Sequence, residues 1–348
     1  MRQEIFFAIA AAVLFGASTP FAKQLLGEVH PLLLAGLLYL GSGLGLTSAR
    51  AIRDGGWKST GLSRTEWPWL LGAILFGGVL GPVALLFGLS RIDAGSASLL
   101  LNLESVLTAL LAWIVFRENA DRRIIAGMLL IVGGGAVLSW PYGGGTTASG
   151  SSMGQLLVAG ACLCWAVDNN LTRKVSTVDS LFIAGSKGLM AGLTNTALAL
   201  ATGAQWPSLG VVTGALLLGL LGYGISLVFF VLALRGLGTA RTGAYFSTAP
   251  FIGAAISLFW LSESASPAFW LAGALMIAGV WLHLTERHEH EHTHERLEHS
   301  HRHVHDEHHQ HSHDDSIEDG VPHEHMHVHN PLTHQHAHFP DIHHQHRH

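Results

Sequence analysis

Three ionisable residues, Glu104, Asp168 and Lys187, lie within long apolar stretches of this sequence. A charge at the centre of a lipid bilayer costs about 2.5–3.5 kcal/mol on insertion scales, so such residues predict a functional site. Glu104 lies near the middle of its stretch, with Asn102 before it and Ser105 directly after it. A buried carboxyl group there suits proton exchange or cation binding. The alternative is a structural acid held neutral by a local hydrogen bond.

Asp168 is followed by Asn169 and Asn170, so three polar residues stand in a row within an apolar stretch. They cannot all face lipid, because the hydrocarbon core offers no hydrogen-bond partners. Some of them must line a cavity or a helix interface. Lys187 lies at a similar depth in the next stretch, and we expect it to pair with Asp168. Such a pair could bind substrate, or it could only lock two helices together.

Ser18 and Thr19 occupy the corresponding place in the first apolar stretch, before Pro20. Their hydroxyl groups could line a pore or bond the helix backbone. No G-x-S-x-G or Walker A motif occurs, so the sequence does not predict an enzyme. No basic patch with interleaved aromatic residues occurs either, which argues against a nucleic-acid partner.

The C-terminal segment is rich in histidine in the pattern H-x-H. Of the 25 histidines, all but His30 and His283 lie there, which leaves 23 (25 − 2). Neutral imidazole binds Ni, Co, Cu and Zn ions, so the tail is predicted to bind a divalent transition metal, although no cofactor is required. A polar tail with incidental metal affinity is the alternative. The low apolar content predicts disorder. The predicted ligands are His288, His290, His292, His294, His299, His301, His303, His305, His308, His309, His311, His313, His323, His325, His327 and His329.

The composition predicts a membrane protein. Hydrophobic residues make up 49% of the 348 positions and charged residues only 12%, against about 25% in globular proteins. A bilayer core of about 30 Å needs about 20 apolar residues in a helix. Ten stretches meet this need, at residues 5–26, 31–51, 67–89, 94–116, 124–140, 154–172, 181–202, 209–234, 239–261 and 268–284.

Lysine and arginine are distributed unevenly between the links that join these stretches. With the N-terminus in the cytoplasm, the external links hold only Lys23 and Arg91. The positive-inside rule therefore predicts a multi-pass protein of the inner or plasma membrane with both termini in the cytoplasm. The cytoplasmic links then hold Arg2, Arg50, Arg53, Lys58, Arg64, Arg117, Arg122, Arg123, Arg173, Lys174, Arg235 and Arg241.

Glycine is frequent within the apolar stretches. Gly41 and Gly45 have the G-x-x-x-G spacing, as do Gly188 and Gly192. Such spacing lets two helix backbones approach closely. We expect these glycines to form packing faces inside the molecule. A homodimer is compatible with the motif, which is weak as a specific dimer signal.

The chain contains an internal repeat with an offset of about 145 residues. Residues 99–118 read LLLNLESVLTALLAWIVFRE, and residues 244–263 read AYFSTAPFIGAAISLFWLSE. Each segment ends in a glutamate, Glu118 or Glu263, and a glycine-rich stretch follows. A duplicated unit of five spans must lie in opposite orientations in the membrane, and inverted repeats place a site near the bilayer midplane.

The opening LFGASTPFAKQLL and the repeated helix that ends in glutamate resemble the drug/metabolite transporter superfamily, specifically its EamA-type family. The resemblance implies an all-α membrane protein of ten transmembrane helices in two inverted five-helix repeats, at 5–140 and 154–284, followed by a disordered cytoplasmic tail at 285–348. The family pattern includes Pro250 in the ninth span. Its counterpart in the fourth span is Ser105, beside Glu104.

The first functional hypothesis is a secondary transporter of a small molecule or ion, embedded in the lipid bilayer and coupled to protons. A divalent metal substrate would explain the tail and Glu104, whereas a metabolite would fit the family resemblance with an incidental tail. The second hypothesis is a membrane-bound metal sensor or buffer whose helices no longer transport. Transport by a variant without the tail distinguishes these hypotheses.

Overall fold

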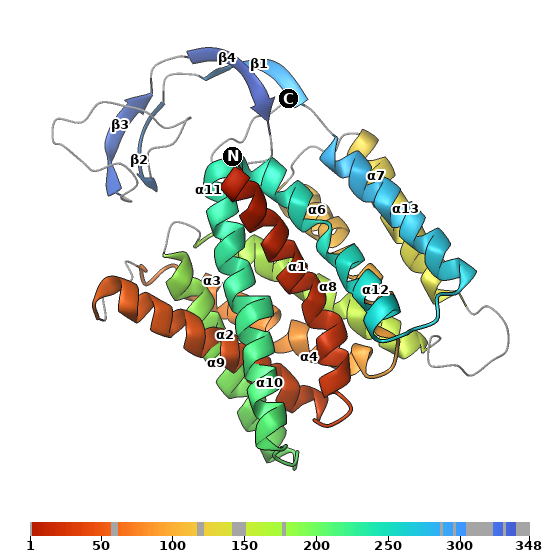
Figure 1. The fold of residues 1–348 in the computed structure, drawn as a ribbon. Helices are drawn as coiled ribbons and strands as arrows, with labels where there is room; N and C mark the ends of the chain where they lie inside the picture. Colours follow the sequence, from red (N-terminus) through yellow and green to blue (C-terminus); the bar gives the residue numbers. More distant parts are fainter. Residues whose placement is uncertain are drawn as a thin grey trace.

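The computed structural model describes residues 2–56, 62–116, 122–140, 151–175, 179–285, 288–294, 297–303, 323–329 and 332–338. Up to residue 285 the described residues form a bundle of α-helices (Figure 1). Two segments within it, η1 and η3, are π-helical. The helices are α1 Arg2–Leu25, α2 Pro31–Asp54, α3 Trp67–Ala73, η1 Ile74–Leu80, α4 Gly81–Leu89, α5 Ala94–Leu100, α6 Leu103–Phe116, α7 Arg122–Ser139, α8 Ser152–Arg173, α9 Ser180–Ala201, α10 Leu209–Gly219, η3 Leu220–Ile225, α11 Ser226–Phe246, α12 Ala249–Trp260 and α13 Pro267–Leu284.

Short polar side chains mark where several helices begin. The carboxylate of Asp93 accepts a hydrogen bond from the backbone N–H of Ser96 at 2.6 Å at the start of α5. Asp179 caps α9 in the same way. Such N-caps satisfy backbone N–H groups that have no partner within the helix. They also explain why the links can be short.

Among the described residues, six helical segments are long and apolar enough to cross a membrane, while α12 and α13 are shorter apolar helices. The predicted stretches at 154–172 and 181–202 are helical as α8 and α9, but they fall outside this group and carry polar residues. The six segments are Gln3–Leu25, Pro31–Asp54, Trp67–Leu89, Ala94–Leu111, Arg122–Ser139 and Leu209–Ala233.

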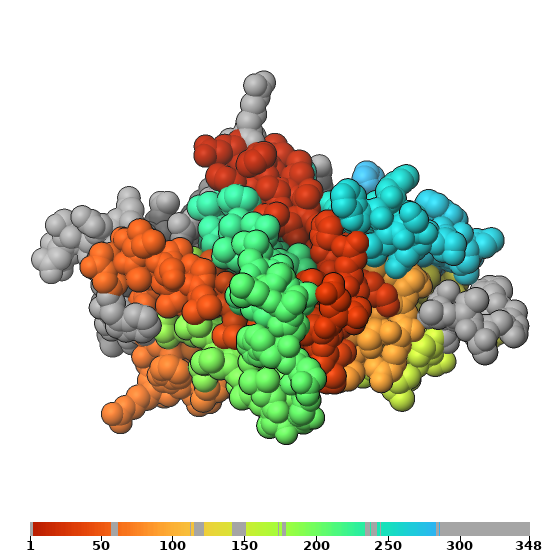
Figure 2. All heavy atoms as spheres, turned by 60° about the horizontal axis from the view of Figure 1, so that its bottom comes forward, coloured from red at the N-terminus to blue at the C-terminus, as the bar shows by residue number. Residues whose placement is uncertain are grey.

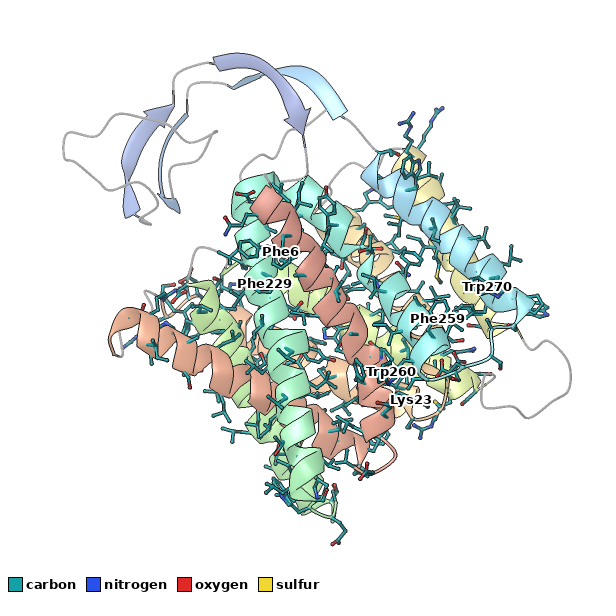
Figure 3. The ribbon with its side chains drawn as sticks, in the orientation of Figure 1. Phe6, Lys23, Phe229, Phe259, Trp260 and Trp270 are labelled. Atoms are coloured by element: carbon teal, nitrogen blue, oxygen red, sulfur yellow. The ribbon has the colours of Figure 1, made fainter. Side chains whose placement is uncertain are left out.

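Large apolar side chains cover much of the outer surface. Phe6, Phe259, Trp260 and Trp270 project from the outside of the bundle (Figure 3), and each is more than 60% exposed. Water would penalise such a surface, because burial of each such side chain stabilises a soluble protein by about 1.5–3 kcal/mol. A surface of this kind suits contact with lipid.

Glycines bring the backbones of α2 and α9 together. A methyl group added at Gly43 would overlap the backbone of Gly188 and Leu189, and one at Gly188 would overlap Gly43. Close backbone approach of this kind is what small residues permit in membrane helices. Gly41 likewise faces the backbone of Leu216 in α10, which lies beside the first helices in the face seen in Figure 2. The prediction that these glycines form internal packing faces is confirmed.

One predicted link is wrong. The sequence placed a connection at 235–238, but the backbone is helical there as part of α11, which extends to Phe246. The prediction treated Arg235 and Arg241 as signs of a loop. Arginine is a good helix former, so a charge marks the preferred side of the membrane rather than the end of a helix.

The described part of the tail consists of four strands, where the sequence predicted disorder. They are β1 His288–His294, β2 Leu297–His303, β3 His323–His329 and β4 Leu332–His338. β1 pairs with β4 and β2 with β3, both antiparallel. The H-x-H repeat has a period of two residues, which is also the period of a β-strand.

Candidate functional site

The fourth apolar segment is broken near its middle, directly before Glu104. α5 ends at Leu100 and α6 begins at Leu103. The amide of Asn102 donates to the carbonyl of Leu99 at 2.9 Å, and the Ser105 hydroxyl donates to the carbonyl of Asn102 at 2.8 Å. Both side chains thus bond backbone carbonyls within or next to the break. Glu104 therefore stands in the first turn of a half-helix, where a negative charge is favoured.

Glu104 is joined to α8 by a side-chain hydrogen bond. The Nδ2 atom of Asn169 donates to Oε1 of Glu104 at 2.9 Å. Glu104 is half-buried and Asn169 is exposed. The structure thus brings together two of the polar residues that the sequence singled out.

Asp168 forms the predicted ion pair with Lys187. The Nζ atom of Lys187 lies 2.6 Å from both carboxylate oxygens of Asp168, and the Thr172 hydroxyl donates to the same carboxylate at 2.8 Å. Asp168 is buried and the Lys187 side chain is only 17% exposed. Charge-assisted hydrogen bonds of this kind are shorter and stronger than those between neutral groups.

The π-helical segment η1 makes room for this ion pair. A methyl group at Gly77 would overlap the carboxylate of Asp168. The carbonyl of Gly77 accepts hydrogen bonds from Tyr39 at 2.7 Å and from the indole of Trp165 at 3.0 Å. π-segments free carbonyls from regular helix bonding and are frequent at functional sites. Sequence analysis missed Tyr39 and Trp165, and the available signal was the Gly77-Gly78 pair within an apolar stretch.

Four other candidate residues bond within their own helix or remain apart from Glu104. Asn170 donates to the carbonyl of Ala166 at 2.8 Å, and Ser18 donates to that of Phe15 at 2.6 Å. Asn102 is buried near Met276, and Thr19 is buried too. Asn170, Ser18 and Asn102 thus bond carbonyls three or four residues earlier in the chain.

A row of aromatic rings begins at Tyr39 in α2 and continues through η3, α1 and α11. The ring centroids of Tyr39 and Tyr223 are 5.6 Å apart, and those of Tyr223 and Phe15 are 6.0 Å apart. The ring centroid of Phe246 lies 5.3 Å from that of Phe15 and 4.8 Å from that of Phe230. Aromatic faces carry partial negative charge and attract cations.

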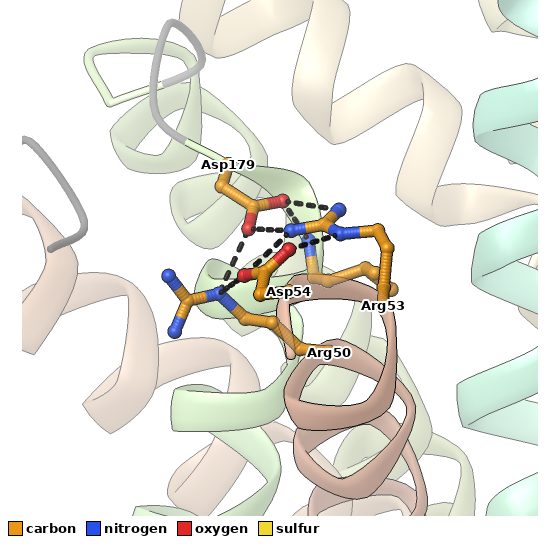
Figure 4. Close-up of polar contacts among 5 residues, drawn as sticks. Arg50, Arg53, Asp54 and Asp179 are labelled. Carbon is orange, nitrogen blue, oxygen red and sulfur yellow. Dashed lines mark hydrogen bonds and ion pairs between the residues drawn. The ribbon is translucent and has the colours of Figure 1, made fainter. Parts of the chain in front are cut away.

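A second ion-pair network ties the C-terminal end of α2 to the start of α9 (Figure 4). Nε of Arg50 lies 2.8 Å from Asp179, and Nη2 of Arg53 lies 2.6 Å from it. Partial burial raises the pKa of Asp179, but the hydrogen bonds from Arg53 and Arg50 outweigh burial and leave the pKa below its ordinary value. This network was not predicted.

Hydrogen bonds also join the end of α1 and the α12–α13 link to the α4–α5 region. The carboxylate of Glu263 accepts hydrogen bonds from the backbone N–H groups of Ala94 and Gly95, both at 2.8 Å. Lys23 donates to the carbonyls of Leu89 and Ile92. Glu118, the repeat counterpart of Glu263, lies outside the described residues.

The tail histidines are described only in part. His305, His308, His309, His311 and His313 lie outside the described residues. Among the residues whose side chains the structure describes, none of which lies beyond residue 285, no three His, Cys, Asp or Glu side chains are gathered to hold a metal ion.

Helices with a lipid-compatible surface and a charged interior site define a polytopic membrane protein of the transporter type. The EamA-like transporter family matches the chain twice, at residues 2–140 and 152–285. The chain therefore belongs to this family.

Three relatives illustrate the similarity. An uncharacterized transporter of Methanothermobacter thermautotrophicus is 28% identical over 287 residues, which cover 79% of this chain and 84% of the relative. A probable 4-amino-4-deoxy-L-arabinose-phosphoundecaprenol flippase subunit ArnE of Pseudomonas aeruginosa is 45% identical over 112 residues, which cover 31% of this chain and 93% of the relative. A solved crystal structure matches with a TM-score of 0.60 at 20% identity, over 80% of this chain and 95% of that one, and so shares the fold.

Proposed function

We propose that this chain is a proton-coupled secondary transporter of a small cationic substrate, with Glu104 as its central acid. One observation carries the proposal: Glu104 opens a half-helix within a membrane segment and is bonded to Asn169 beside the Asp168–Lys187 pair. Broken membrane helices provide the binding sites of many secondary transporters. An acid there can exchange a proton for a cation.

The balance of charge favours a cation. Lys187 neutralises Asp168, so an ionised Glu104 leaves one net negative charge at the site. Asn169 is exposed, and polar groups of this kind avoid lipid. The hydrogen-bonded side chains of Asn169 and Glu104 therefore fit the lining of a water-filled path. A proton and a substrate cation would compete for the same carboxylate.

Matched irregularities support two inverted repeats. Two features recur at about the offset of the sequence repeat. One is the helix break, at 101–102 and again at 247–248, and the other is the π-segment, at Ile74–Leu80 and again at Leu220–Ile225. A methyl group at Gly222 would crowd Ser18, much as one at Gly77 would overlap Asp168. We infer that ten helices form two five-helix units of opposite orientation, which rock about the central site to give alternating access.

Two kinds of cation remain candidates for the substrate. The aromatic row that begins at Tyr39 favours an organic cation, because ring faces bind such ions. The histidine tail favours a divalent transition metal. The relative named as a flippase subunit adds an amino-sugar lipid to the comparison, and a 4-amino group is also cationic near neutral pH.

A transport assay separates these outcomes. Purified protein is placed in liposomes with an imposed pH gradient, and uptake of Zn(II), Co(II), Ni(II) and a quaternary ammonium ion is measured. We expect uptake of one class to depend on the gradient and to be lost in Glu104→Gln. The exposed Glu28→Gln is the matched control and should transport normally. Gradient-independent binding of metals without uptake of any probe would instead support the sensor hypothesis.

A further inference from the structure

The strand register of the tail places histidine opposite histidine. In the ribbon of β1 and β4, the opposed pairs are His288 with His338, His290 with His336 and His292 with His334. In the ribbon of β2 and β3, they are His299 with His327, His301 with His325 and His303 with His323. The two ribbons use the same arrangement, although different segments of the chain build them.

All histidines of one ribbon's pairs share one face. Residues two apart in a strand lie on the same face, and directly opposed residues do so as well. The other face of the first ribbon holds Glu289 and Glu291 with Ala337 and Gln335. Each ribbon thus gathers six paired histidine positions on one side, and a seventh, His294 or His329, stands opposite a leucine on the same side.

The spacing of these positions suits a metal ion. Opposed Cα atoms in an antiparallel pair lie about 4.5–5.5 Å apart, and positions two apart along a strand lie about 6.6 Å apart. Two imidazole nitrogens on one Zn(II) ion lie at most about 4.2 Å apart, since each Zn–N bond is about 2.1 Å. Two neighbouring pairs can therefore supply four nitrogen ligands from within one ribbon.

We propose that each ribbon is a divalent transition-metal site formed by two neighbouring cross-strand histidine pairs. In the first ribbon these are His290, His292, His334 and His336. A two-stranded ribbon is only marginally stable in water. Metal bound only to the paired form stabilises that form. Metal therefore both occupies the ribbon and fixes its register, which a flexible histidine array would not do.

Matched sets of four histidines test whether register matters. The full-length protein in detergent is titrated with Zn(II) by calorimetry at pH 7.5. In the ladder variant, His290, His292, His334 and His336 are changed to Asn. In the control, His308, His309, His311 and His313 are changed to Asn, so both proteins lose the same number of imidazoles. We expect the ladder variant to lose one bound ion or to weaken the tightest site by more than about 10-fold, while the control keeps its tightest site.

Equal losses in the two variants would overturn the proposal, because they would show that only the number of histidines counts. A cross-link supplies a second test. Glu291→Cys with Gln335→Cys joins directly opposed positions, whereas Glu291→Cys with Ala337→Cys is out of register by two residues. A disulfide needs Cα atoms about 4.4–6.8 Å apart.

Zn(II) should increase formation of the opposed disulfide, mapped by peptide mass, more than the out-of-register one. Equal yields with and without metal would contradict the proposal. Neither readout uses transport, so the tail site stands or falls separately from the function proposed for the helices.

Discussion

The amide of Asn169 donates a hydrogen bond of 2.9 Å to the carboxylate of Glu104. The two residues are 65 positions apart in the chain, so the bond joins two separate helices. The bond links the start of α6 to α8, where Asp168 meets Lys187. A charged substrate that displaces Asn169 would release this link. If the proposed site binds substrate there, the bond would couple its occupation to the relative position of the two helices.

The Asp168–Lys187 pair should behave as one unit. Asp168→Asn or Lys187→Met alone leaves an uncompensated buried charge and should lower the free energy of unfolding by about 3–5 kcal/mol. The double variant removes both charges and should recover most of that loss. A double-mutant cycle on unfolding in SDS measures the coupling. Additive losses would show that the contact contributes nothing to stability.

Gly77 should be intolerant of even a methyl group. Gly77→Ala would push against the Asp168 carboxylate. We expect it to lower the free energy of unfolding by about 1–3 kcal/mol and to reduce transport. Gly160→Ala, in α8 itself, is the matched control, because nothing lies within 4 Å of the added atom. Equal tolerance of both substitutions would contradict the close fit of η1 against Asp168.

The charge and the capping role of Asp179 can be separated. Asparagine still caps a helix, so Asp179→Asn should lose only the ion pairs with Arg50 and Arg53. We expect this loss to lower the free energy of unfolding by about 1–3 kcal/mol at pH 7. Asp179→Ala should lose the cap as well.

The pKa of Asp179 is lowered in the folded protein, so its contribution to stability is present above the unfolded pKa of about 3.9 and is lost as pH falls through the lower folded value. The stability difference between the wild type and Asp179→Asn should therefore shrink as pH falls below about 4. A difference that is independent of pH would rule out the ion pairs as its source.

The arginine and lysine distribution predicts that both termini lie in the cytoplasm. Reporter fusions at Gly145 and at the C-terminus should lie on opposite sides of the membrane, with the C-terminal reporter active in the cytoplasm. Placement of both reporters on the same side would exclude an odd number of spans between them and, with it, the inverted arrangement.

Contacts between neighbouring helices were within reach of sequence reasoning. Asp168 and Lys187 lie 19 positions apart on consecutive helices of similar depth, and opposite charges in lipid leave few alternatives to pairing. The glycine faces of α2 and α9 were predictable for a similar reason, since G-x-x-x-G needs a close partner backbone.

Long-range and local irregularities were not predictable. Arg50 and Asp179 lie 129 positions apart, and nothing in the local pattern of either residue identifies the other. Tyr39 and Trp165 meet at the carbonyl of Gly77 only because η1 departs from α-helical bonding. Hydropathy reports whether a segment is apolar, but it carries no information about which backbone groups bond to each other.

The most direct measurement is proton movement in liposomes that contain the purified protein and an internal pH-sensitive dye. When the transported cation is added outside, wild-type protein should release protons from the lumen in proportion to the cation taken up, because the cation and the proton share Glu104. Glu104→Gln should give neither signal, while Glu28→Gln should match the wild type. Normal cation uptake with normal proton release in Glu104→Gln would contradict the account.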